Sequence, residues 1–148
     1  YIICRYRIND FVVDIMPTND PSIGFTNKGY PEGFKRAVEY QIDENSSIRI
    51  LNAPFFIATK LEVFKGRGNG DGRTSHDFED IIYILENRKS VWEELSSSDE
   101  EVRKYLKSEI LNLVGSPYIN EWIDAHIERS NQISTYSILE KLNKFCSY

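Results

Sequence analysis

The chain has 148 residues, with 18 lysines and arginines against 23 aspartates and glutamates, which gives a formal net charge of −5. This length fits one domain, and 41% hydrophobic with 28% charged residues is typical of a folded protein rather than a disordered one. The acidic balance argues against a protein that holds duplex nucleic acid mainly by phosphate contacts. No apolar run approaches the roughly 20 residues of a membrane span.

Neither end of the sequence carries a strong targeting or disulfide signal. Cys4 and Cys146 lie near opposite ends, so they predict no disulfide framework and no metal site. We therefore expect a reducing, cytoplasmic setting. The sequence starts at Tyr1, directly in a β-rich run, and this favours a chain that continues upstream.

The first third of the chain is rich in strand formers. Two β-rich runs, Ile2–Ile8 and Phe11–Met16, flank the polar pair Asn9-Asp10, a pattern that predicts a hairpin. A loop rich in Asn, Gly, Pro and Ser follows over Thr18–Gly29. We expect a short helix over Pro31–Tyr40, because proline suits the first position of a helix.

A third strand and two helices are expected in the middle of the chain. The strand covers Ser47–Leu51, and Asn52 is suited to cap a helix from about Pro54 to Lys65. Four of the eight glycines alternate with polar residues over 65–73, which predicts a loop. A second helix is expected from about Ser75 to Asn87.

The remainder of the sequence has helical periodicity. Ser98 and Glu101 have the spacing of a capping box, and Ser116-Pro117 fits the start of a further helix that carries Ile127. Strands in the first third and helices afterwards predict an α+β fold, with a small sheet and a helical C-terminal part. We expect a core over residues 1–90 and a helical region over 91–148.

Asp14 is the first candidate functional residue, because it interrupts the apolar run Val-Val-Asp-Ile-Met. A buried carboxylate needs a partner or a metal ion, since burying an unpaired charge is costly. In a cleft it would suit Mg²⁺, which prefers oxygen ligands. The alternative is an edge strand on which Asp14 faces solvent.

Lys60 is the second candidate. It lies four residues from both Phe56 and Phe64, so the three share one helical face. An ammonium group in this position could reach a triphosphate. The alternative is a lysine whose methylene groups cover apolar surface.

Two further groups of residues could meet a nucleotide. Asp77 and Asp80 are three residues apart and so share one face of the second helix, although a position at a helix start or in solvent also accounts for them. In the glycine loop, Lys65, Arg67 and Arg73 could meet a polyphosphate. This loop lacks the Gly-x-x-x-x-Gly-Lys-Ser/Thr pattern, and the alternative is a mobile connection.

Several segments occur in an order that is familiar from one enzyme family. They are Phe11–Pro17, Gly24–Asn27, Asn52–Phe64 and Ser75–Ile81. The series resembles the AbiEii/AbiGii-toxin-like nucleotidyltransferases of the polymerase-β-type superfamily, above all in Ala-Thr-Lys-Leu-Glu-x-Phe followed by His-Asp-x-Glu-Asp. The resemblance implies that residues 1–90 are the C-terminal portion of a nucleotidyltransferase-like core, a small mixed sheet flanked by helices.

The resemblance also assigns roles to single residues. Asp14 matches the third carboxylate of the family and would ligate the metal ion. Lys60 matches a lysine on the helix after the sheet, and Asp77 and Asp80 match an Asp-x-x-Asp helix. We accordingly expect catalysis by Asp14 and Lys60, and nucleotide binding by Lys60, Arg67, Asp77 and Asp80.

The family transfers a nucleoside monophosphate from an NTP to an acceptor with Mg²⁺, and several members are toxins of toxin–antitoxin pairs. The resemblance therefore implies Mg²⁺-dependent nucleotidyl transfer from an NTP. The acceptor would be RNA, a protein or a small molecule, and an antitoxin protein is the expected partner.

One departure from the family keeps alternatives open. Its Gly-Ser helix start and Asp-x-Asp strand do not occur here, and the nearest pair, Asn9-Asp10, falls in a turn. Either these residues precede Tyr1, or the chain is a degenerate relative. The second case predicts a non-catalytic module that binds nucleotide or protein, such as an antitoxin or regulator, with Tyr118 and Trp122 on its working surface. A plain structural domain is the third possibility.

Overall fold

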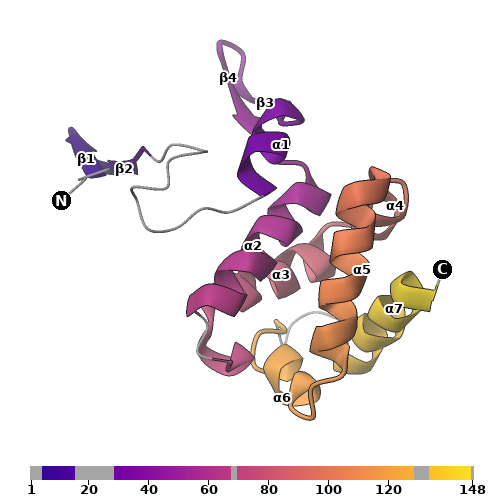
Figure 1. Ribbon diagram of the computed structural model, residues 1–148. Coiled ribbons are helices and arrows are strands. Elements are labelled where there is room, and N and C mark those ends of the chain that lie inside the picture. Colours follow the sequence, from indigo (N-terminus) through magenta and orange to yellow (C-terminus); the bar gives the residue numbers. More distant parts are fainter. Residues whose placement is uncertain (1–4, 16–28, 68–69, 129–133, 148) are drawn as a thin grey trace.

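The computed structural model describes residues 5–15, 29–67, 70–128 and 134–147 (Figure 1). Within these ranges two hairpins precede a helical body, and this arrangement confirms the α+β class with a helical C-terminal part. The elements in chain order are β1 (Arg5–Ile8), β2 (Phe11–Asp14), α1 (Gly29–Lys35), β3 (Val38–Asp43), β4 (Ser46–Ile50), α2 (Ala53–Arg67), the 3₁₀ helix η2 (Gly72–Thr74), α3 (His76–Asn87), α4 (Val91–Ser96), α5 (Glu100–Val114), α6 (Ile119–Asp124) and α7 (Thr135–Ser147).

The first hairpin forms where the sequence predicts it. Strands β1 and β2 are antiparallel, and the pairing of Ile8 with Phe11 places Asn9-Asp10 in the turn. Asn9 has a φ of 54°, a left-handed conformation that asparagine tolerates better than most residues. Of the loop predicted over Thr18–Gly29, residues 18–28 lie outside the described residues, and Gly29 is the first residue of α1 rather than part of a loop.

The helix expected over Pro31–Tyr40 is wrong in its second half. Helix α1 ends at Lys35, and the chain continues into strand β3. The apolar side chains of Val38, Tyr40 and Ile42 alternate with polar ones, and this period of two is the pattern of a strand. The alternation therefore outweighs the proline signal for a longer helix.

The predicted strand over 47–51 is confirmed as β4, and it pairs with β3 in antiparallel register. Among the described residues, the strands form two separate two-stranded sheets rather than one mixed sheet. Arg49 of β4 connects its hairpin to α1. Its guanidinium donates to the carbonyl oxygen of Phe34 at 3.0 Å and lies 5.2 Å from the centre of the Phe34 ring.

Helix α2 is the central element of the body, and α5 runs beside it (Figure 1). Helix α2 starts where the sequence predicts, because the side-chain oxygen of Asn52 accepts a hydrogen bond from the backbone N–H of Phe55 at 3.1 Å. The expected apolar stripe of Ile57, Leu61 and Phe64 is buried. Buried side chains on its other faces allow α2 to contact α1, α3, α4 and α5.

Helix α3 also matches its prediction and begins after Ser75, whose hydroxyl oxygen accepts the N–H of Phe78 at 3.3 Å. The Phe78 ring is almost fully buried. It packs against Phe64 and Trp122, with ring centres 5.5 and 5.9 Å away. This aromatic group joins α2, α3 and α6 in one core.

The predicted capping box at Ser98 and Glu101 is wrong. Asp99 occupies the position before α5 and makes no side-chain cap, while the Ser98 hydroxyl donates to the carbonyl oxygen of Leu95 at 2.7 Å. Asp99 instead pairs with Arg36 at 2.5 Å. The helix after Ser116-Pro117 is also shorter than expected, because α6 ends before Ile127.

One apolar core runs from Ala53 of α2 to Phe145 of α7, so helices on both sides of residue 90 contribute to it. In both hairpins, by contrast, large apolar side chains such as Phe11, Tyr40 and Ile48 are exposed. In the part of the chain that the structure describes, no helix combines the length and the apolarity that crossing a membrane requires.

Candidate functional site

The structure brings three of the five predicted site residues together. The ammonium nitrogen of Lys60 on α2 lies 3.2 Å from Asp77 and 2.5 Å from Asp80, both on α3. The two carboxylates lie one helical turn apart, so both can face the same point on α2. We call Lys60, Asp77 and Asp80 the lysine–aspartate cluster.

The cluster is built from one buried and one accessible carboxylate. The side chain of Asp77 is 7% exposed and that of Asp80 is 46% exposed, while Lys60 is 25% exposed. Asp77 lies in the first turn of α3, where the helix dipole favours a negative charge. The Lys60 ammonium also lies 5.7 Å from the centre of the Phe56 ring, which holds the lysine stem on the helical face that its spacing predicts.

The charge state of Lys60 follows from this environment. Partial burial by itself lowers the pKa of Lys60, but hydrogen bonds to Asp80 and Asp77 outweigh it, so the pKa is raised above the ordinary lysine value. The ammonium therefore stays protonated at neutral pH. One cation faces two carboxylates, which gives the cluster a formal charge of −1, so a phosphate group would have to replace one of them as the partner of Lys60.

Asp14 is not part of this cluster. It ends β2, and its carboxylate accepts two hydrogen bonds from the Arg5 guanidinium, at 2.8 and 2.9 Å. Its side chain is 45% exposed, and the hydrogen bond from Arg5 lowers the pKa of Asp14. Asp14 therefore lies on an exposed hairpin with an arginine as its partner.

A magnesium site of the predicted kind needs several oxygen ligands close together. Within the described ranges, no three His, Cys, Asp or Glu side chains gather closely enough to hold a metal ion. The oxygens of Asp14 are engaged by Arg5, and Lys60 lies between Asp77 and Asp80. The described residues therefore do not by themselves fit Mg²⁺.

The glycine-rich segment is a packed connection at its C-terminal end. Gly72 is buried in η2, and its carbonyl oxygen lies 2.6 Å from Nε2 of His126, just beyond α6. The Arg73 guanidinium is engaged by Asp71 at 2.8 Å. Arg67 is in the last turn of α2, and its side chain lies outside the described residues.

Lys65, at the other end of this segment, is also engaged. It lies 2.6 Å from Glu62 and 3.1 Å from Glu109, and these hydrogen bonds raise the pKa of Lys65 despite the opposing effect of burial. Of the three cations that the sequence suggested for a polyphosphate, Lys65 and Arg73 therefore already have carboxylate partners.

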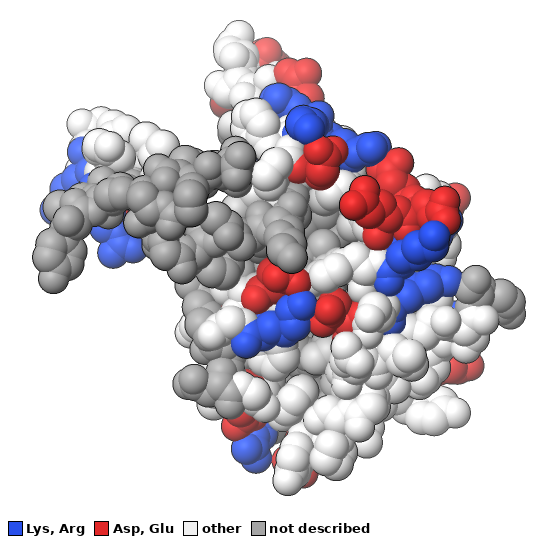
Figure 2. Space-filling model, viewed as in Figure 1, with Lys and Arg blue, Asp and Glu red and all other residues white. Residues whose placement is uncertain are grey.

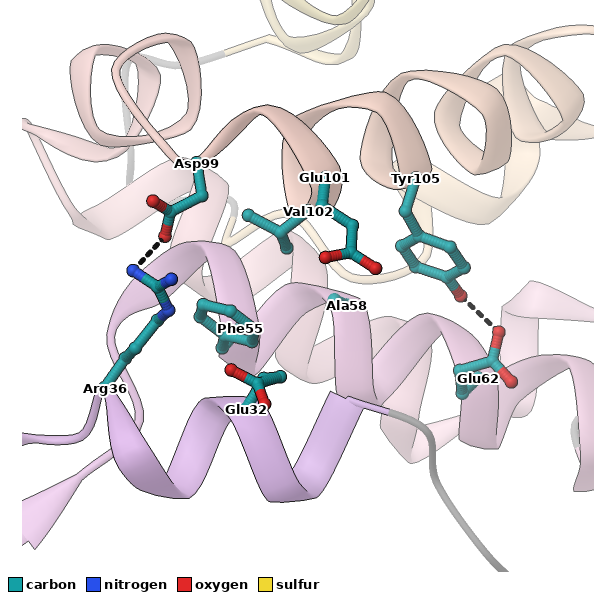
Figure 3. A pocket seen from close by; sticks show the side chains of 9 residues that line it. All are labelled: Glu32, Arg36, Phe55, Ala58, Glu62, Asp99, Glu101, Val102 and Tyr105. Atoms are coloured by element: carbon teal, nitrogen blue, oxygen red, sulfur yellow. Dashed lines mark hydrogen bonds and ion pairs between the residues drawn. The ribbon is translucent and has the colours of Figure 1, made fainter.

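Sequence reasoning missed a hollow of about 240 Å³ between α1, α2 and α5 (Figure 3). Phe55, Ala58 and Val102 form its apolar wall. The Arg36–Asp99 pair lies at one end, and the Tyr105 hydroxyl donates to Glu62 at the other (Figure 3). The spacing of Phe55, Ala58 and Glu62 indicates that they share one face of α2, and this was the available signal for the hollow. The residues that face them belong to α1 and α5, so no pattern within one segment reveals the hollow.

The charge of this hollow decides what it accepts. Glu32, Glu62, Asp99 and Glu101 line it against the single cation Arg36. Burial, with the hydrogen bond to Glu62, holds the pKa of Tyr105 far above its usual range, so the phenol stays neutral. Figure 2 shows acidic side chains gathered over the start of α5. Such a lining repels phosphate, so the hollow does not suit a triphosphate.

No protein family model, curated protein or solved structure matches the chain.

Proposed function

We propose that the chain binds an NTP and takes part in Mg²⁺-dependent transfer of its nucleoside monophosphate to an acceptor, in the cytoplasm. The observation that carries the proposal is the lysine–aspartate cluster. It joins two segments that the family resemblance singles out, around Lys60 and around Asp77–Asp80.

Unequal burial gives the cluster a way to receive a phosphate. The exposed partner Asp80 is the weaker one, because ion pairs in contact with water contribute little. An arriving phosphate would replace Asp80, while the buried Asp77 keeps the ammonium oriented. Positioned positive charge of this kind is what phosphoryl transfer requires. The described residues supply no complete site for the metal ion of this proposal.

Nucleotide binding tests the proposal directly. Fluorescent analogues of the four NTPs are titrated into the whole chain with and without Mg²⁺. We expect binding that Mg²⁺ strengthens and that Lys60→Met weakens about tenfold, the loss of roughly one charge-assisted contact. Lys104→Met is the matched control, because Lys104 is an exposed lysine that pairs with Glu100, away from the lysine–aspartate cluster. Absence of NTP binding in the wild-type chain would overturn the proposal.

Transfer itself requires a second readout. With an NTP labelled at the α-phosphate, we expect label to move to RNA, to protein or to a small molecule, and the labelled fraction identifies the acceptor. Asp14→Ala should abolish transfer and leave the circular dichroism spectrum unchanged. If the protein is a toxin, co-expression with its antitoxin partner should relieve growth arrest that the wild-type chain causes and the Asp14→Ala variant does not.

The second candidate function is a non-catalytic module that binds nucleotide or protein. The observation in its favour is the bidentate ion pair of Asp14 with Arg5, in which both carboxylate oxygens accept hydrogen bonds. This candidate predicts nucleotide or protein binding without movement of label, and equal binding by the wild type and Asp14→Ala.

A further inference from the structure

Helices α4, α5 and α7 enclose an open groove of about 680 Å³. Its lining contains four cations and two aromatic side chains: Arg103, Lys107, Lys141, Lys144, Trp92 and Phe145. Glu93 is the acidic residue among the groove's lining side chains, so the formal charge of the lining is 4 − 1 = +3. This is the reverse of the whole chain, whose net charge is −5.

The lysines of this groove differ from the other lysines that lie on α2 and α5. Lys60, Lys65 and Lys104 all have carboxylate partners. Among the residues that the structure describes, Lys107, Lys141 and Lys144 have no carboxylate within ion-pair distance. Within the described part of the chain, no carboxylate therefore neutralises their charge.

Other contacts hold the groove cations in place without cancelling their charge. The ammonium of Lys141 lies 5.8 Å from the centre of the Trp92 ring, and that of Lys107 lies 5.7 Å from the Phe145 ring. The Arg103 guanidinium donates to the carbonyl oxygen of Ser98 at 2.6 Å. Aromatic faces and carbonyl groups attract a cation but leave its full charge available to an incoming anion.

The arrangement favours an extended ligand with repeated negative charges. Arg103 and Lys107 are one turn apart on α5, and Lys141 and Lys144 are one turn apart on α7, so each pair forms a row with steps of about 5–6 Å. Lysine binds phosphate as a point charge and needs no fixed geometry. Trp92 is only partly buried at the wall, and an accessible aromatic ring next to a basic groove is the usual arrangement for stacking a nucleic-acid base.

We propose that this groove binds the phosphate backbone of a single-stranded nucleic acid, with one base against Trp92. The proposal is independent of nucleotidyl transfer, because the lysine–aspartate cluster joins α2 and α3, whereas the groove is made by α4, α5 and α7.

The test measures the binding of a fluorescein-labelled oligothymidylate of about twelve nucleotides by fluorescence anisotropy. For single strands, the logarithm of the affinity falls with the logarithm of salt concentration with a slope of about −0.7 per phosphate contact. Four cations therefore predict a slope near −3 between about 50 and 200 mM salt. The triple variant K107Q/K141Q/K144Q should bind at least about tenfold more weakly at low salt, with a slope about 2 units shallower.

Lys104→Gln is the matched control, since Lys104 lies on the same helix but outside the groove. It should keep the affinity and slope of the wild type. None of the three groove substitutions removes an ion pair between residues that the structure describes, so the variants should fold, as a thermal melt would verify. Wild-type anisotropy that does not change, or a triple variant that binds as the wild type does, overturns the proposal.

Competition identifies the ligand class. Unlabelled oligothymidylate should displace the probe well below the concentration at which oligoglutamate or inorganic tripolyphosphate does so. Equal displacement by oligoglutamate would make the groove a site for acidic protein, and equal displacement by tripolyphosphate would make it a site for free phosphates; either result overturns the proposal. Tryptophan fluorescence should be quenched on binding in the wild type but not in Trp92→Phe, and quenching that persists contradicts the base contact.

Discussion

Gly72 lies so close to the indole ring of Trp122 that a Cβ at this position would come within 2.7 Å of the ring atoms Cγ and Cδ2. Real Cβ atoms essentially never approach another atom so closely. Glycine is therefore required at this point by the packing of η2 on α6. At this position of the glycine-rich segment, glycine is needed because the backbone packs closely against the Trp122 ring, and not because the segment must be flexible.

Substitution of Gly72 should accordingly destabilise the fold. We expect Gly72→Ala to lower the free energy of unfolding by about 1–3 kcal/mol, because the buried ring must shift to admit the methyl group. Urea unfolding followed by circular dichroism measures the change. Gly115→Ala is the control: its Cβ would meet nothing nearer than 3.4 Å, so we expect a change within about 0.5 kcal/mol. Equal effects of the two substitutions would contradict the packing argument.

Local signals in the sequence predicted much of this fold. The Asn9-Asp10 turn, the Asn52 cap and the stripe of Ile57, Leu61 and Phe64 are each set by residues close together in the chain, and the structure confirms them. The Lys60 position on its helical face was also readable from spacing. Patterns of this kind work because they depend on helix or strand geometry alone.

Features that depend on contacts between distant segments were not predictable in this way. Asp99 does not cap α5 because its carboxylate meets Arg36, which is 63 residues earlier. The acidic hollow and the basic groove are each lined by separate helices, so no single segment of sequence signals them. The partner of Asp14 was within nine residues, but only the register of the hairpin places Arg5 opposite it.

Two of the helix starts that the sequence suggested, at Asn52 and at Ser98, should respond differently to mutation. Asn52→Ala removes an acceptor for the N–H of Phe55, and loss of such a cap costs about 1 kcal/mol of stability. Ser98→Ala should cost less than about 0.5 kcal/mol, because Ser98 caps no N–H of α5. Urea unfolding measures the free energy of both variants. A larger loss of stability in Ser98→Ala than in Asn52→Ala would show that Ser98 does cap α5.

The neutral phenol of Tyr105 can be detected by titration. Since burial and the hydrogen bond to Glu62 raise its pKa far above the usual tyrosine range, Tyr105 should not ionise below about pH 12 in the folded chain. The rise in tyrosinate absorbance up to that pH should be the same in Tyr105→Phe as in the wild type. In denaturant, where all nine tyrosines are exposed, the variant should lose one ninth of the signal. A deficit in the folded variant would show that Tyr105 ionises normally.

The raised pKa of Lys60 predicts how the stability of the fold changes with pH. A folded state that holds this proton more tightly than the unfolded chain gains stability that is complete below the ordinary lysine pKa of 10.5. That contribution is lost as the pH rises through the higher pKa of the folded state. Lys60→Met should therefore lower the free energy of unfolding by about 1.5–3 kcal/mol at neutral pH, the range for hydrogen bonds to charged groups.

The difference between the wild type and Lys60→Met should stay constant from neutral pH to about pH 10 and shrink above it. Urea unfolding at a series of pH values measures this difference, and tyrosine ionisation cancels because both proteins contain the same tyrosines. When Asp77→Asn and Asp80→Asn are already present, Lys60→Met should no longer show this pH dependence, since the hydrogen bonds that raise the pKa are gone. A difference that grows with pH would mean that burial dominates, and that Lys60 is not the protonated centre of the cluster.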